Sequence, residues 1–181
     1  MNTHLVPSLK KWKLDYEIEA IENLGSWYLN TGYKPMHILK MLKKHKQDVC
    51  FLDSDAVIVK FPGLLFEVSD DYDLACHMLD WHLHWRGISG QSKRELLSGT
   101  MVWKYKPNVL SLLERYVDEC RKRPNVWEQK ILQGILEKTN EYRIYELPAD
   151  YCAVVNHNYQ IPAYIKNPVI VHWQKSRNYK G

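Results

Sequence analysis

Residues 48–62 read DVCFLDSDAVIVKFP. This stretch decides the fold, because its apolar run 49–52 has the length and composition of a buried strand. Two carboxylates follow directly, Asp53 and Asp55. Burying an ionised carboxylate costs several kcal/mol unless a positive group meets it. The stretch therefore predicts a strand whose end faces a cation, a proton or an arginine.

The composition is that of one globular domain covering residues 1–181. Hydrophobic residues make up 45% of the chain and charged residues 25%, which excludes a disordered or membrane-embedded protein. No apolar run approaches the ~20 residues of a membrane span, and the N-terminus lacks the apolar core of a signal peptide. We therefore expect a cytoplasmic protein. The four cysteines lie far apart without a C-x-x-C motif, which favours reduced, buried thiols over a zinc site or disulfides.

The net charge of +4 is mildly basic, and much of the excess lies in residues 39–46 and 173–181. The sequence has no zinc-finger spacing, no RNA-binding aromatic motif and no block of five like charges. Nucleic acid is therefore not expected as the main partner. Two or three of these cations are enough to bind the phosphates of a small ligand.

Strand-like and helix-like segments alternate along the chain. We expect strands at 16–21, 49–52, 72–78, 95–103, 142–148 and 168–173, and helices at 36–46, 108–122 and 127–137. Such alternation predicts an α/β domain with a largely parallel central sheet. Ligands of these sheets bind outside the carboxyl ends of the strands, which is where Asp53 and Asp55 lie. Residues i and i+2 of an extended chain point the same way, so both carboxylates can face one ion.

A D-x-D pair is weak evidence by itself. With ten aspartates in 181 residues, chance gives about 0.5 such pairs, and a second pair occurs at Asp71 and Asp73. The second pair lies in a polar turn, VSDDYD, and is interpreted as solvated or capping. For Asp53 and Asp55 the alternative is a strand-end turn with side-chain hydrogen bonds to its own backbone.

The segment PVIVHWQKSR, residues 168–177, is a second apolar strand that ends in polar side chains. Its His172, together with Asp53 and Asp55, makes a ligand set suited to Mn²⁺ or Mg²⁺. Lys175 and Arg177 follow and would bind the same phosphates. The alternative for His172 is a hydrogen-bonded core histidine. The cations beside it and its place at a strand end favour the metal-ligand interpretation.

Six segments, in this order, resemble those of the metal-dependent nucleotide-sugar glycosyltransferases with the GT-A fold, especially glycogenin-like and galactosyltransferase-like members. They are LGSWYLNTGYKPMHILKML (24–42), FLDSDAVIVKFP (51–62), LLSGTMVWKYKPNVLSLLERY (96–116), WEQKILQGIL (127–136), LPADYC (147–152) and VIVHWQKSR (169–177). No single motif is decisive, but together they cover most of the chain. The resemblance implies a GT-A, Rossmann-like α/β fold and transfer of a sugar from a nucleoside diphosphate sugar, with a UDP-sugar as the expected donor, to an unknown hydroxyl.

The resemblance also implies roles for individual residues. The metal, Mn²⁺ or Mg²⁺, would be held by Asp53, Asp55 and His172. Charge on the leaving diphosphate would be neutralised by Lys34, Lys175 and Arg177. The donor sugar would be lined by Ser98, Gly99 and Thr100, where Gly99 lets the backbone come close. Glu128 and Gln129 would be the catalytic candidates near the acceptor, and their alternative is an exposed first helical turn.

One departure concerns the N-terminus. Residues 5–12, LVPSLKKW, look like the end of the helix that follows the family's first strand. The sequence therefore suggests an N-terminally shortened domain in which the strand that holds the nucleobase is missing.

Two other functions are also compatible with the sequence. A phosphatase of the haloacid dehalogenase type also places Asp-x-Asp after an apolar strand, and Val57 fits that pattern. That family needs a later acidic metal motif, which VSDDYD supplies too early, and it leaves His172 unexplained. The third possibility is a catalytically weak or inactive module that keeps metal, nucleotide or sugar affinity.

Overall fold

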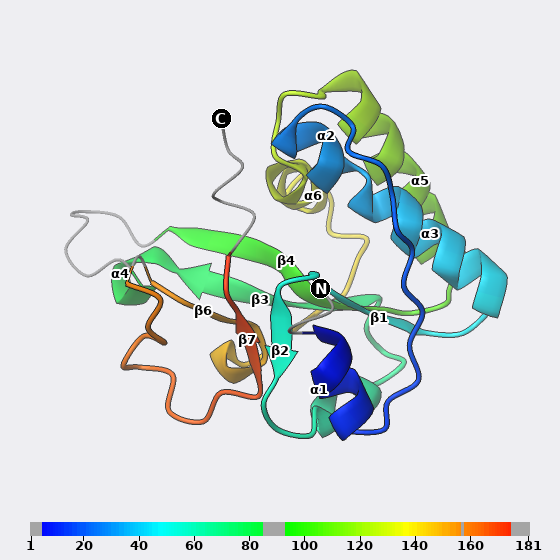
Figure 1. The fold of residues 1–181 in the computed structure, drawn as a ribbon. Coiled ribbons are helices and arrows are strands. Elements are labelled where there is room, and N and C mark those ends of the chain that lie inside the picture. Colours follow the sequence, from blue (N-terminus) through cyan, green and yellow to red (C-terminus); the bar gives the residue numbers. More distant parts are fainter. Residues whose placement is uncertain (1–4, 85–92, 157, 175–181) are drawn as a thin grey trace.

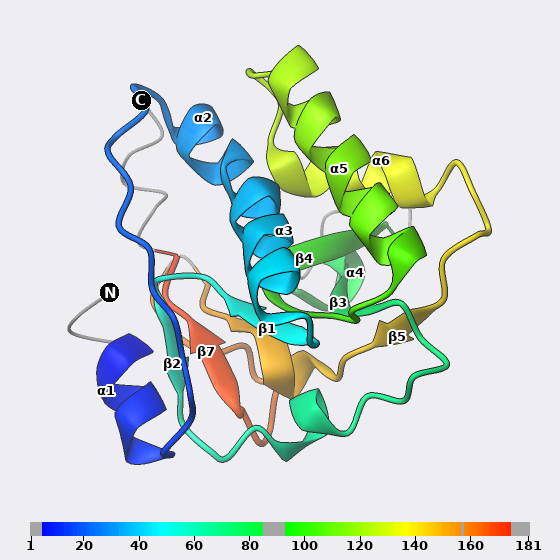
Figure 2. The same ribbon diagram turned by 90° about the vertical axis from the view of Figure 1, so that its right-hand side faces the viewer.

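The centre of the molecule is a four-stranded sheet with the strand order β1-β4-β3-β5. A smaller sheet with the order β2-β7-β6 lies on one side of it, and most of the helices lie on the other (Figures 1 and 2). The structure, a computed structural model, describes residues 5–84, 93–156 and 158–174. Its strands are β1 (Val49–Leu52), β2 (Ala56–Ile58), β3 (Leu74–Asp80), β4 (Arg94–Trp103), β5 (Ile144–Glu146), β6 (Ala153–Val154) and β7 (Ile170–His172).

The helices form two groups. Above the large sheet lie α2 (Trp27–Gly32), α3 (Lys34–His45), α5 (Pro107–Lys122) and α6 (Glu128–Leu136), whereas α1 (Leu5–Lys11) lies beside the small sheet (Figure 1). A short α4 (Trp81–His84) follows β3, and two 3-10 turns are η1 (Gly63–Phe66) and η2 (Ala149–Cys152). Among the described residues, no helix combines the length and apolar character needed to cross a bilayer.

The α/β class is confirmed, and strand direction follows the predicted parallel pattern with one exception. Because β1 and β3 both run antiparallel to β4, they run parallel to each other, and β5 is parallel to β3. Only β4 is reversed. It stands between β1 and β3, so two of the three strand pairings are antiparallel even though the other three strands of this sheet run in the predicted common direction. Local patterning cannot reveal this, because a buried strand has the same apolar run in either direction.

The ladder between β3 and β4 is interrupted in the middle. Cys76 pairs with Met101, yet the next residue, His77, pairs with Leu97. Residues 98–100 of β4 therefore have no partner on β3, and of these Thr100 pairs with Leu52 of β1. Irregularities of this kind redirect side chains and are common beside functional sites.

Sequence features explain where helices α3 and α5 begin, which face of α5 is buried and where α3 ends. Pro35 and Pro107 stand in the first turns of α3 and α5, where a missing N–H costs nothing. The buried stripe of α5 is the one that its helical spacing predicts: Val109, Leu112, Leu113, Tyr116, Val117 and Cys120. Lys46 ends α3 in the left-handed conformation, with φ +53°.

Residues 16–21 do not form the predicted strand. The segment is extended but has no strand partner, and it runs past α3 on the outside of the molecule (Figure 1). Its alternating acids bind helix α3: Glu17 contacts Lys44 and His45, and Glu19 contacts His37 and Lys40. The alternation therefore serves ion pairing rather than a sheet face.

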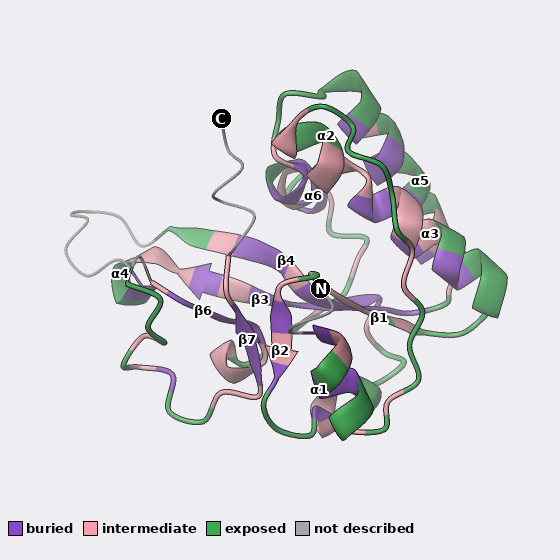
Figure 3. Cartoon of the chain, viewed as in Figure 1, coloured by how far each residue is buried: buried purple, intermediate pink, exposed green. Residues whose placement is uncertain are grey.

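The core is divided by the large sheet. One apolar cluster lies between the sheet and the helices α3, α5 and α6, and it includes Trp103 and Leu112. The second lies on the other face under α1, β2 and η1, and it includes Ile58 and Leu65. The large sheet is therefore covered on both faces, and its two central strands, β3 and β4, are mostly buried (Figure 3). Functional side chains can reach its strand ends from either layer.

The central helix α5 provides a test of this core. We expect Leu112→Ala, at a fully buried position, to lower the free energy of unfolding by about 2–5 kcal/mol, because it removes apolar contacts and leaves a cavity. The neighbouring exposed Ser111→Ala is the control and should change it by less than about 0.5 kcal/mol. Urea denaturation followed by circular dichroism measures both. Equal effects of the two substitutions would contradict the assigned helix face.

Candidate functional site

Three ligand-type side chains meet where the two sheets join. Asp53 follows β1, Asp55 precedes β2, and His172 ends β7. The antiparallel pairing of β2 with β7 places Ala56 opposite His172, which brings the imidazole beside Asp55. One ligand atom from each residue lies within 4.8 Å of the other two. The structure thus brings together the three residues that the sequence analysis grouped as metal ligands.

His172 is held from two sides. Its Nε2 lies 2.8 Å from Thr100 Oγ1, and its Nδ1 lies 3.6 Å from Asp55 Oδ1. When Nε2 bonds to Thr100, Nδ1 is the nitrogen that faces the carboxylates. Burial lowers the pKa of His172, but Cys152 and the carboxylates of Asp55 and Asp53 raise it to about 10. The pocket therefore favours a positive charge at this position.

Gly99 makes room for this ring. A Cβ atom at residue 99 would lie 2.9 Å from His172 Cε1, 3.0 Å from Nδ1 and 3.3 Å from Nε2. Real Cβ atoms essentially never approach this closely, so any other residue would move the imidazole. The backbone of Gly99 also contacts the metal-ligand loop, because its carbonyl accepts a hydrogen bond from Asp53 N at 2.8 Å.

The ammonium of Lys34 is the centre of a buried polar network. Its Nζ lies 2.9 Å from Asp53 Oδ1, 2.9 Å from Glu128 Oε1 and 2.9 Å from Ser98 Oγ. Burial lowers the pKa of Lys34, but the carboxylates of Asp53 and Glu128 more than offset this and hold it above its usual range. Three donors are thus occupied by three protein oxygens. These contacts favour a positioning role for Lys34 over direct phosphate binding.

Ser98 and Gln129 tie helix α6 to strand β4. Ser98 Oγ donates to Glu128 Oε1 at 2.7 Å, while Gln129 Oε1 accepts from Ser98 N at 3.1 Å. The other end of the amide, Gln129 Nε2, donates to Glu95 Oε1 at 2.7 Å. Both ends of the Gln129 side chain are therefore used inside the protein, which favours a positioning role for it as well.

Glu128 keeps one oxygen without a partner. The residue is 0% exposed, so the first turn of α6 is buried rather than exposed as the alternative interpretation expected. Within the described part of the chain, Glu128 Oε2 and the Tyr116 hydroxyl lack hydrogen-bond partners. Burial, and next the charge of Glu128, raises the pKa of Tyr116 well above its usual range, so that hydroxyl stays protonated. Unpaired buried oxygens are expensive and mark places where water or a ligand binds.

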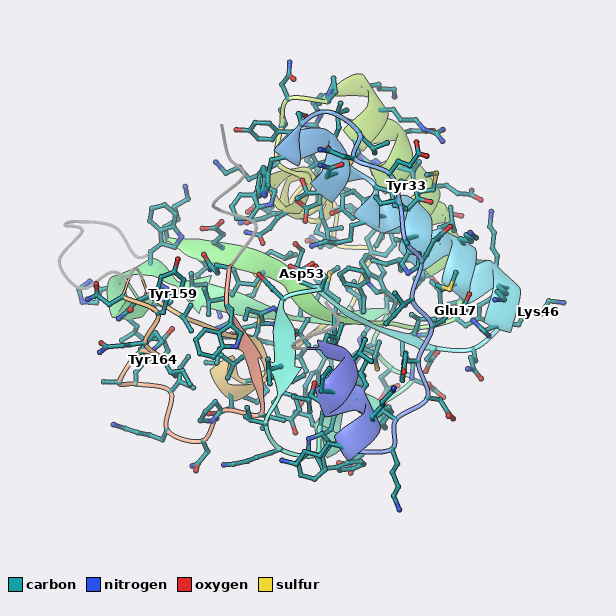
Figure 4. All side chains as sticks on the ribbon, in the orientation of Figure 1. Glu17, Tyr33, Lys46, Asp53, Tyr159 and Tyr164 are labelled. Carbon is teal, nitrogen blue, oxygen red and sulfur yellow. The ribbon has the colours of Figure 1, made fainter. Side chains whose placement is uncertain are left out.

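These groups line one cleft of about 2160 Å³. Lys34, Asp53, Asp55, His172 and Glu128 line it, whereas Thr100, fully buried, supports the wall from behind. Figure 4 shows Asp53 near the middle of the molecule, between the helical layer and β2. The cleft exceeds the ~300–1,000 Å³ of a usual small-molecule pocket, so it has room for two substrates.

The Ser-Gly-Thr segment serves both layers. Ser98 bonds to groups on α3 and α6, whereas Thr100 bonds to His172 on β7. In a regular strand residues i and i+2 share a face, and the interrupted ladder lifts that restriction. Ser98 and Gly99 line the cleft, and Thr100 does not. The predicted phosphate ligands Lys175 and Arg177 lie outside the described residues.

Two features were missed by the sequence analysis. Trp27 of α2 and Trp127, directly before α6, contact each other at the cleft wall with ring centroids 5.5 Å apart. A hundred residues separate them, and no local pattern indicates the pair. The second Asp pair is also only partly solvated. Asp71 is exposed, but Asp73 is buried and accepts from Asn108 Nδ2, Lys106 Nζ and Arg143 N, which makes it a structural link.

The family model for nucleotide-diphospho-sugar transferases matches residues 15–180. The chain belongs to this family. This identification removes the phosphatase alternative, which belongs to a different class of fold and chemistry. No curated protein matches the chain in sequence.

Solved structures show the same fold at low identity. A glycosyltransferase involved in glycosylation of the major capsid of PBCV-1 aligns with 96% of this chain and 87% of its own, at 13% identity and a TM-score of 0.67. Apo GlyE of Streptococcus pneumoniae TIGR4 aligns with 87% of this chain and 39% of its own, at 18% identity and a TM-score of 0.54. Mouse xyloside xylosyltransferase 1 aligns with 82% of this chain and 64% of its own, at 15% identity and a TM-score of 0.51. The GT-A fold expected from the sequence is confirmed.

Gly99→Ala tests the packing of His172. We expect it to destabilise the protein by about 1–3 kcal/mol, because the new methyl group must displace the imidazole. Gly134→Ala in α6 is the matched control, since a Cβ there meets nothing within 4 Å, and it should stabilise by up to about 1 kcal/mol. Chemical denaturation measures both, and the His172 ring signals in NMR report the displacement. Unchanged ring signals in Gly99→Ala would show that the close approach is absent.

The Lys34 network predicts that substitutions in it lower the free energy of unfolding strongly and non-additively. Lys34→Met should cost about 3–5 kcal/mol, because it leaves the buried Glu128 carboxylate without its cation. Adding Glu128→Gln should recover part of this loss, so the double variant should cost less than the sum of the two single variants. The control on the same helix is Lys43→Met, whose pair with Glu114 is exposed; it should cost less than about 1 kcal/mol. Additive losses in denaturation experiments would exclude the coupling.

Proposed function

We propose that the chain transfers a sugar from a UDP-sugar to a hydroxyl-bearing acceptor and that a divalent metal, Mn²⁺ or Mg²⁺, holds the donor diphosphate. One observation carries the proposal: Asp53, Asp55 and His172 converge at the wall of the cleft in a chain that belongs to the nucleotide-diphospho-sugar transferase family. Two carboxylates and one imidazole leave open positions for phosphate oxygens and water.

The residues present fit such a cation. The carboxylates of Asp53 and Asp55 and the Nδ1 of His172 are close enough to share it, and Thr100 fixes the ring through the opposite nitrogen. The same carboxylates that raise the pKa of His172 would hold a divalent cation in place of the proton. When bound, the cation supplies Lewis acidity toward the diphosphate leaving group.

The protein's own cations would complete the donor site. Lys34 holds Asp53 in position from the helical layer, and through Glu128 it fixes the start of α6 relative to the metal ligands. Lys175 and Arg177 come shortly after His172 in the sequence and are proposed as the groups that neutralise phosphate charge as the nucleoside diphosphate leaves.

The sugar would lie against the wall of the cleft where β4 meets the start of α6. Gly99 presents backbone without a side chain at the cleft wall, and Ser98 lies beside it, so this segment is proposed to face the donor sugar. Thr100 would act through His172. Beside Ser98, Glu128 is proposed as the catalytic candidate near the reacting hydroxyl, since its Oε2 has no partner among the described residues. Gln129 would position it through Ser98 and Glu95.

Metal-dependent nucleotide binding tests the proposal. We expect isothermal titration to show that Mn²⁺ strengthens UDP binding, and that Asp53→Asn with Asp55→Asn weakens binding in the presence of Mn²⁺ by at least about 10-fold, because the cation loses two ligands. Asp71→Asn is the matched control, since Asp71 is an exposed aspartate of the second D-x-D pair; it should bind like the unaltered protein.

An activity assay on the unaltered protein then distinguishes catalysis from binding alone. Consumption of UDP-sugars with release of UDP, measured over a panel of donors, is expected for the transferase. Metal-dependent UDP binding without any donor consumption would favour the inactive binding module instead. Equal UDP affinity with and without Mn²⁺ would exclude the proposed metal-bridged donor site.

A further inference from the structure

Exposed aromatic rings gather beside α1 and η1, and Figures 1 and 2 show α1 at one end of the molecule, beside the small sheet. Phe61 is 53% exposed and Phe66 58%, and their ring centroids are 6.1 Å apart. Trp12 packs edge-on against Phe61 at 6.3 Å. We call Trp12, Phe61 and Phe66, with the neighbouring Lys10, Lys11, Lys13 and Lys60, the aromatic–lysine surface.

The core beneath does not need these phenylalanines. Pro62 and Leu65, on either side of Gly63 in the same turn, are buried, and Leu65 belongs to the cluster under α1. Phe61 and Phe66 flank them and face outward. Trp12 is anchored from below, because its Nε1 donates to Ile58 O at 3.0 Å. The rings are thus held on a rigid base while much of their apolar area stays in water, which is costly without a partner.

The lysines of this surface carry uncompensated charge. Among the described residues, Lys10, Lys11, Lys13 and Lys60 have no carboxylate within 4.0 Å, whereas Lys40, Lys43 and Lys44 of α3 all have one. Lys11 Nζ lies 4.9 Å from the Trp12 ring centroid, and Lys60 directly precedes Phe61. The acidic neighbours in sequence, Asp15 and Glu67, are fewer, so the surface is positive overall.

We propose that the aromatic–lysine surface docks the protein onto the surface of a membrane that contains anionic lipid. Aromatic rings flanked by lysines suit the boundary between headgroups and acyl chains, where rings enter the apolar layer and ammonium groups stay at the phosphates. The charge favours an anionic bilayer over a neutral one. Phenylalanine offers no hydrogen-bonding group, so these rings fit a lipid surface better than a polar ligand.

The docking face is continuous with the active cleft. Trp12, Phe61 and Phe66 also line the rim of the cleft that contains Asp53 and His172. A docked molecule would therefore hold this rim against the headgroups, and acceptors carried by the membrane would be close to it. The binding itself does not depend on the proposed transferase activity, because no metal ligand belongs to the surface.

Co-sedimentation with vesicles tests the inference. The protein is mixed with vesicles of phosphatidylcholine alone or of phosphatidylcholine with phosphatidylglycerol, at an ionic strength of about 0.1 M. We expect it to sediment with the anionic vesicles and to remain in solution with the neutral ones. The combined Phe61→Ser and Phe66→Ser variant should lose at least about 10-fold in affinity, and each Lys→Gln change in the surface about 5-fold.

Matched controls lie elsewhere on the protein. Tyr159→Ser removes an exposed aromatic ring, 56% exposed, from a distant loop; Lys130→Gln with Lys138→Gln removes two exposed lysines from the region of α6. Both should bind vesicles like the unaltered protein. Circular dichroism verifies that each variant is folded, and the lysine variants provide a second test if the double phenylalanine variant is not. Failure to sediment with anionic vesicles, or equal losses in the control variants, would overturn the proposal and leave an acidic protein as the occupant of this surface.

Discussion

The buried ammonium of Lys34 is the contact on which the rest of the site depends. It comes from α3, and it meets Asp53 after β1, Glu128 at the start of α6 and Ser98 in β4. Four elements distant in the sequence are thereby fixed around one charge. Such an arrangement is costly unless every partner is present, because each ion loses its water on folding. The network therefore holds the carboxylates of Asp53 and Glu128, which both contact the Lys34 ammonium, at a defined separation.

A second constraint acts from the other layer. The interruption of the β3–β4 ladder gives residues 98–100 a path that a regular strand does not allow, and Gly99 leaves the space that the His172 ring occupies. Thr100 then binds the far side of that ring. The irregularity in the sheet is thus the reason that one short segment supports both the helical network and the proposed metal ligand. A more regular ladder would be more stable locally but would separate these two functions.

The two constraints give the cleft an uneven chemistry. Near Asp53 it is charged, closely bonded and mostly buried, which suits the preorganised electrostatics that transfer of a charged leaving group requires. Toward α1 and η1 it opens to the rings of Trp12, Phe61 and Phe66 and to Lys13. The rigid, polar centre of the cleft suits the proposed chemistry, and its apolar, cationic rim suits the proposed attachment to a membrane. Both depend on the same sheet, because its two faces carry separate apolar clusters.

The sequence by itself determined the α/β class, the boundaries of β1 and α5 to within a residue or so, and the grouping of Asp53, Asp55 and His172. These follow from local patterns: a short apolar run bounded by polar residues fits a buried strand, and apolar residues at helical spacing form a buried stripe. Only the tertiary structure decided the reversed direction of β4, the use of Glu17 and Glu19 as ion-pair partners, and the burial of Glu128. It also decided that Lys34 is enclosed by carboxylates rather than free for phosphate. Direction, pairing and enclosure depend on which segments meet in space, and the order of residues along the chain does not contain that information in any local form.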